Sequence, residues 1–169
     1  MPDIPAPVLG LSLLGLPRLV LDGVDVSGRV KYRKSWALWA LLGTTPGQTH
    51  DRAVLSEWLW PDHSPPSARA NLRQVIADLR GLLESAGLRH AFQSSVQTVG
   101  LSPDERLAVD AERLQRWAKA CARAHDQDWG ALPEDGVLDV LSDGGFLQGF
   151  DLPPLMLTPD EIEAAVLGA

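Results

Sequence analysis

The chain has 169 residues, of which 45% are hydrophobic and 22% charged, a balance typical of ordinary globular domains. This length can bury a sizeable core in one large or two small domains, and the composition excludes global disorder and a collagen-like repeat. The net charge of −7 is unevenly divided, because residues 1–101 hold ten Lys and Arg against eight Asp and Glu, whereas residues 102–169 hold five against fourteen. The asymmetry indicates a mildly basic module followed by an acidic one.

Three features of the sequence bear on the compartment. The longest uncharged stretches are too short, or too interrupted by Gly and Pro, to cross a bilayer. The N-terminal segment lacks the basic region of a signal peptide. The single cysteine, Cys121, cannot form an internal disulfide and fits a reducing environment. We therefore expect a cytoplasmic protein without membrane contact.

Taken in chain order, the basic module predicts two β regions with three helices between them. Residues 8–26 contain short apolar runs separated by Gly and Asp-Gly, which is typical of a small antiparallel sheet. The apolar spacing then predicts helices over about 33–42 and 51–60. A longer helix spans 64–85, with a serine N-cap and a proline at its first helical position. Residues 91–101 predict a hairpin, so the order is that of a winged helix-turn-helix with an N-terminal sheet.

The acidic remainder predicts a short all-α extension. Residues 109–125 have one apolar helical face, residues 133–141 form a weaker helix, and residues 158–167 begin with a Thr-Pro capping pattern. The fold class is therefore α+β. We expect a winged helix-turn-helix DNA-binding domain over 1–104 and a truncated helical extension over 105–169.

The third predicted helix is the strongest functional signal. Its aliphatic residues form one continuous stripe that must pack inward. Its outward face and flanks carry polar and charged side chains: Arg69, Asn71, Arg73, Gln74, Asp78 and Arg80. Such a helix can lie in the major groove, where Arg matches guanine and an Asn or Gln amide matches adenine.

Further cations precede the first predicted helix and are candidates for contacts to the phosphate backbone: Arg29, Lys31, Arg33 and Lys34. The charge pattern by itself is equally compatible with the solvated surface of an ordinary helical domain. The hairpin that directly follows the third helix favours DNA.

Other chemistry has little support in the sequence. Four of the six tryptophans fall on the first two helices, where their spacing favours core packing over base stacking. No histidine pair has the spacing of a zinc helix, and no glycine loop for phosphate is present. We expect no enzymatic activity, no metal and no cofactor. A cleft lined by His50, Asp51 and His63 would reopen the question of an enzyme.

Several segments resemble one known family. YRKSWALWALLG, HDRAVLSEWLWP and SARANLRQVIADLR resemble the DNA-binding domain of SARP-type bacterial activators. SSVQTVGLSPDERLAVDAERLQRW resembles their wing and the entry into the bacterial transcriptional activation domain, and GGFLQGF at 144–150 resembles a motif near the end of that domain's first helical unit. The resemblance covers about 8–152 and is most specific in the third-helix segment.

The resemblance implies a fold related to the effector domain of response regulators. It also implies activation of transcription through promoter repeats and contact with RNA polymerase. Position by position, it puts five residues in the recognition helix: Arg69, Asn71, Arg73, Gln74 and Arg80.

The chain departs from this family at three places. Asp78 stands where relatives often have a basic or neutral residue. The family's activation domain is a larger tetratricopeptide-like array, of which about one unit is present here. Residues 149–169 are similar instead to the segment that precedes the WYL domain in another class of bacterial regulators.

Together these observations predict a sequence-specific regulator of transcription, an activator, that binds double-stranded DNA. Helix 64–85 enters the major groove, the hairpin 91–101 touches the adjacent backbone or minor groove, and the acidic part serves dimerisation or contacts with partners. The alternative is a protein-interaction module on a winged-helix scaffold that has lost DNA binding. The net charge of −7 and Asp78 favour that alternative.

Overall fold

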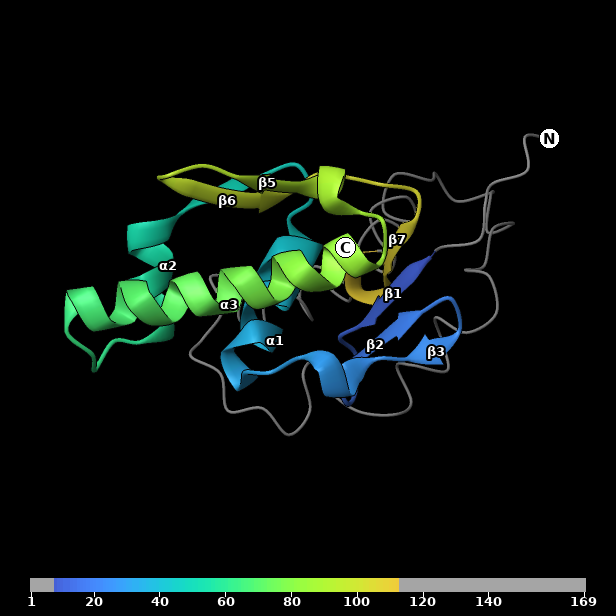
Figure 1. Ribbon diagram of the computed structural model, residues 1–169, viewed down its shortest axis with the longest axis horizontal. Helices are drawn as coiled ribbons and strands as arrows, with labels where there is room; N and C mark the ends of the chain where they lie inside the picture. Colours follow the sequence, from blue (N-terminus) through green and yellow to red (C-terminus); the bar gives the residue numbers. More distant parts are fainter. Residues whose placement is uncertain (1–7, 113–169) are drawn as a thin grey trace, which may run out of the picture.

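The computed structural model describes residues 8–112, which form two small sheets and three α-helices (Figure 1). The elements in chain order are β1 (Leu9–Ser12), β2 (Arg18–Leu21), β3 (Val24–Asp25), η1 (Ser27–Arg29), α1 (Arg33–Thr44), β4 (Thr49–Asp51), α2 (Arg52–Leu59), α3 (Pro65–Ser85), η2 (Arg89–Ala91), β5 (Phe92–Ser94), β6 (Thr98–Leu101) and β7 (Leu107–Val109). The all-α extension expected over 105–169 falls almost wholly, and the WYL-like segment 149–169 entirely, outside the described residues.

The N-terminal sheet contains one strand that the sequence did not predict. Its order is β3-β2-β1-β7, with β1 antiparallel to β2 and parallel to β7. The sheet is therefore mixed rather than antiparallel. Because β7 follows residue 104, the N-terminal sheet includes a strand that lies beyond the predicted domain end at 104. The Asp110 carboxylate fixes the chain just after β7 by accepting hydrogen bonds from the backbone N–H groups of Leu13 and Leu14.

The first two helices lie close to their predicted ranges and supply much of the core. Trp39 is fully buried in α1 and Trp36 is nearly so, which confirms core packing for both indoles. The two tryptophans at the end of α2, Trp58 and Trp60, are partly buried against the same cluster. Asp51 caps α2, since its carboxylate accepts hydrogen bonds from the backbone N–H groups of Ala53 and Val54 at 2.7 and 3.2 Å.

The second sheet forms the wing and has three strands instead of the expected two. The predicted hairpin is present as β5 and β6, and β4 pairs antiparallel with β6 to give the order β4-β6-β5. Gly100 in β6 allows this pairing, because a Cβ there would lie 2.4 Å from the carbonyl oxygen of Gln48. The wing therefore combines a strand that precedes α2 with a hairpin that follows α3.

Helix α3 begins at two prolines and runs along one face of the molecule (Figure 1). Its aliphatic residues are buried against α1 and α2. The wing lies on one side of the helix, and η1 with the start of α1 lies on the other. The face of α3 that points away from α1 and α2 is therefore exposed, with the wing on one side of it and the segment from η1 to the start of α1 on the other.

Candidate nucleic-acid interface

The open face of α3 has small residues along its centre and arginines along one edge. With 100° per residue, Ala70, Ala77 and Gly81 fall near the middle of the exposed face. All three predicted arginines, Arg69, Arg73 and Arg80, are exposed and fall on the edge that faces the wing. Because the side chains at the centre of this face are small, another surface can approach the helix backbone closely. The arginine side chains extend along the edge of the same face.

The two predicted amides are separated from these arginines. Gln74 is exposed but lies toward the other edge of the helix, and Asn71 is half-buried. The Nε atoms of Arg69 and Arg73 donate to main-chain oxygens one turn back, at 3.1 and 3.3 Å. Each of these bonds uses one of the five donors of its guanidinium. The structure therefore brings three arginines together and keeps the amides apart from them.

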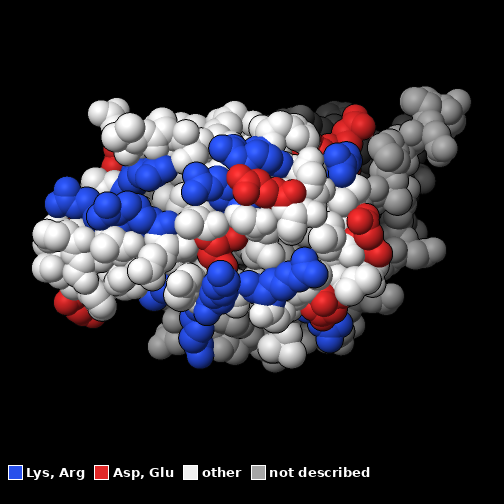
Figure 2. All heavy atoms as spheres, in the orientation of Figure 1, with Lys and Arg blue, Asp and Glu red and all other residues white. Residues whose placement is uncertain are grey.

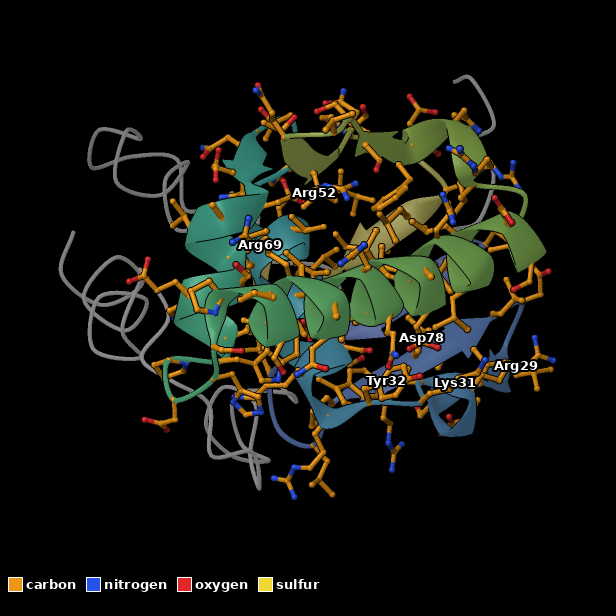
Figure 3. All side chains as sticks on the ribbon, turned by 60° about the vertical axis from the view of Figure 1, so that its left-hand side comes forward. Arg29, Lys31, Tyr32, Arg52, Arg69 and Asp78 are labelled. Carbon is orange, nitrogen blue, oxygen red and sulfur yellow. The ribbon has the colours of Figure 1, made fainter. Side chains whose placement is uncertain are left out.

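Arg52 joins the arginine edge and was missed in the sequence. It is the first residue of α2, and its Nη2 donates to Ser94 Oγ in the wing at 2.7 Å (Figure 3). Partial burial lowers the pKa of Arg52, and the positive charge of Arg80 lowers it further. In the part of the chain that the structure describes, neither arginine forms an ion pair with a carboxylate. Two unneutralised guanidinium groups in one place attract an anion.

The tip of the wing is ordered by one serine and exposes one apolar side chain. Ser95 Oγ accepts hydrogen bonds from the backbone N–H groups of Gln97 and Thr98, at 3.1 and 2.9 Å. The turn leaves Val96 with 93% of its side chain exposed. The backbone N–H of Arg52 donates to the carbonyl of Gln97 at 2.8 Å, so the tip is held against the start of α2.

A second group of cations lies on the far flank of α3, in the segment from η1 to the first turn of α1. Lys31 and Arg33 are exposed and Lys34 is half-buried. Figure 2 shows Lys and Arg side chains gathered on both flanks of this face, with a few acidic side chains among them. Arg52 and Arg69, on one side of α3, and Lys31, on the other, represent these two groups in Figure 3.

Asp78 does not lie on the outward flank of α3, where the sequence pattern put it. Its side chain is 9% exposed and points toward the segment before α1 (Figure 3). Its Oδ2 accepts hydrogen bonds from Ser35 Oγ at 2.9 Å and from the backbone N–H of Lys31 at 3.2 Å. The flank prediction was wrong because residue 78 falls next to α1 once the helices pack. The support that Asp78 gave to a protein-interaction module is thereby removed.

Two of the three residues considered for catalysis, His50 and Asp51, have structural partners, and His63 is exposed. His50 Nε2 lies 2.8 Å from Thr45 Oγ1, and burial lowers the pKa of this imidazole. Asp51 caps α2, as described above. Within residues 8–112 no three His, Cys, Asp or Glu side chains are grouped so that they could hold a metal ion. No helix in the same range is long and apolar enough to span a bilayer.

The elements described above define a winged helix-turn-helix with an N-terminal sheet. This chain is similar to the solved structure of Mycobacterium tuberculosis EmbR in complex with a low affinity phosphopeptide, with 26% identity and a TM-score of 0.56. The similarity supports a SARP-like winged-helix fold for this chain. No protein-family model and no curated protein sequence matches this chain.

The similarity covers 67% of this chain and 30% of the EmbR chain. The phosphopeptide belongs to that complex.

Proposed function

We propose that this chain is a transcriptional regulator of the SARP type that binds double-stranded DNA in a sequence-specific manner. The observation that carries the proposal is the arginine edge of α3, where Arg52 and Arg80 lie together without a carboxylate partner among residues 8–112. Basic surfaces of this kind bind the phosphates of DNA.

The two flanks of α3 fit the shape of a major groove. The groove is about 12 Å wide and admits one helix between two phosphate backbones. With α3 inserted, one backbone faces Arg52 and the wing, and the other faces the segment with Lys31, Arg33 and Lys34. The small residues at the centre of α3 let its backbone come close to the base edges. This docking uses both groups of cations at once.

The proposed roles of individual residues follow from their positions on α3 or on the two sides of it. Arg73 and Gln74 read base edges, with Arg69, Asn71 and Arg80 in the same recognition helix. Arg52, Lys31, Arg33 and Lys34 contact phosphate and set the register on the duplex. The wing tip with Val96 lies against the neighbouring minor groove or backbone.

The proposal also includes the regulatory role, the compartment and the partners of this protein. The regulator acts as an activator in the cytoplasm, and RNA polymerase is its protein partner. The acidic part of the chain provides a homodimer contact or a contact with that partner. Tandem half-sites would favour side-by-side monomers, and a palindrome would favour a two-fold dimer.

Selection of bound sequences from a random DNA pool with the full chain tests the proposal. The expected result is an enriched motif that the protein prefers over random DNA, with affinity that falls as salt rises. Absence of binding at low salt refutes the proposal and favours the protein-interaction module. Binding without an enriched motif refutes base reading and leaves a nonspecific DNA-binding protein.

A further inference from the structure

A carboxylate in the middle of a DNA-reading helix is unexpected, because it repels phosphate. Asp78 is also one of three buried polar side chains among residues 8–112, together with Ser35 and Ser56. Burial of a carboxylate is costly unless hydrogen bonds and positive charge compensate it. The groups around Asp78 must therefore compensate the cost of burying its carboxylate.

The partners of Asp78 come from the start of α1. Ser35, which is fully buried in the first turn of α1, donates its hydroxyl to Oδ2, and the backbone N–H of Lys31 donates to the same oxygen. The N-cap residue of α1, Tyr32, provides no side-chain cap, and the first turn of α1 holds no acidic residue. Asp78 thus supplies from α3 the negative charge that a helix N-terminus favours.

The segment that Asp78 holds is the cationic one. Residues 29–34 include Arg29, Lys31, Arg33 and Lys34 and contain no acidic residue. Figure 3 shows Lys31 and Tyr32 next to Asp78, with Arg29 beyond them on the same flank of α3. A bond from α3 to the backbone at Lys31 fixes where this segment lies relative to the recognition helix.

We propose that Asp78 is a positioning residue that holds the cationic segment 29–34 beside α3, so that its lysines meet the second phosphate backbone while α3 occupies the groove. The inference rests on the proposed function. It predicts that a negative charge in the recognition helix increases the affinity for DNA, whereas simple charge counting predicts the opposite.

The variant D78N separates these two accounts, because it removes the charge and one acceptor while it keeps the size of the side chain. We expect D78N to bind the selected DNA about fivefold to thirtyfold more weakly. The slope of log affinity against log salt should fall by about 1 to 2, the loss of one or two phosphate contacts. E84Q is the matched control, since Glu84 is exposed near the end of α3 and pairs with Arg89 at 2.9 Å. It should bind as tightly as wild type or more tightly.

A second variant and a second measurement protect the test from a folding defect. S35A removes the hydroxyl donor without a change of charge and should weaken binding in the same direction by a smaller factor. Limited digestion of the free protein with trypsin should cut the segment 29–34 faster in D78N than in wild type.

Folded D78N that binds with wild-type affinity and wild-type salt slope overturns the inference. If D78N does not fold, S35A decides the question: wild-type affinity and a wild-type salt slope in S35A also overturn the inference. A wild-type protein that binds no DNA overturns the proposed function instead, whatever the digestion shows.

Discussion

Arg52→Met tests whether the arginine edge of α3 continues into α2 and meets phosphate. The substitution removes the bond from Nη2 to Ser94 Oγ, which measures 2.7 Å, and leaves the backbone bond to Gln97 in place. It also removes a buried Nε that has no hydrogen-bond partner in the described part of the chain, and it ends the repulsion with Arg80. These changes oppose one another, so we expect the free energy of unfolding to change by less than about 1 kcal/mol.

The effect on DNA should be much larger than the effect on folding. A charged hydrogen bond to phosphate contributes about 1.5 kcal/mol, so the affinity should fall about tenfold at low salt. One lost phosphate contact lowers the salt slope by about 0.9. Between 50 and 200 mM salt, the variant should therefore lose about 3.5-fold less affinity than wild type does over the same range.

The assay is a fluorescence anisotropy titration at three salt concentrations, with the selected DNA and with random DNA. Both DNAs should be affected equally, because phosphate contacts carry no sequence information. Arg18→Met is the control, since Arg18 is exposed on β2 in the N-terminal sheet. An unchanged salt slope in Arg52→Met, or an equal loss in Arg18→Met, would refute the reasoning.

The remaining predictions concern base reading, pH and packing. Arg73→Ala should cost about 1–3 kcal/mol on the selected site and relax specificity there, whereas Lys34→Ala should weaken all DNA alike; equal losses on selected and random DNA for both variants would remove the base-reading role of Arg73. Burial lowers the pKa of His50 below its ordinary value of 6.5, so the unfolded chain binds the proton first and stability should fall as pH drops below about 6.5. Urea unfolding between pH 7.5 and 5.5 measures this loss, and His50→Gln should remove it; an identical pH dependence in the variant contradicts the assignment. Leu79→Ala should lower the free energy of unfolding by about 2–5 kcal/mol, because Leu79 is fully buried, whereas Gln74→Ala on the exposed side should stay within about 0.5 kcal/mol. Similar losses in these two variants would contradict the orientation of α3.

The helices of the basic module could be predicted from the sequence because their signals are local. A serine followed by two prolines starts α3, and an aliphatic stripe of helical period fixes which face it buries. The same stripe fixes that Arg69, Arg73 and Arg80 are exposed. The EmbR comparison supports the SARP-like fold that the sequence segments indicated.

Other features depend on partners that are distant in the sequence. β7 pairs with β1 across almost a hundred residues, and a strand of three apolar residues carries no sign of that pairing. Asp78 has the spacing of a flank position, and only the packing of α3 against α1 turns it toward Ser35 and Lys31. In the sequence Arg52 has no feature beyond its place at the start of a helix, and only the tertiary structure shows its contact with Ser94 in the wing.

The sequence by itself determined the type and order of the helices and the hairpin, because hydrophobic period and capping act over a few residues. The tertiary structure decided which polar groups meet, because the contacts of a side chain depend on the element that packs against its own. Charge on the surface of α3 followed from the sequence, whereas the two-sided arrangement of cations around it, with a buried aspartate between them, came from the packing of the helices.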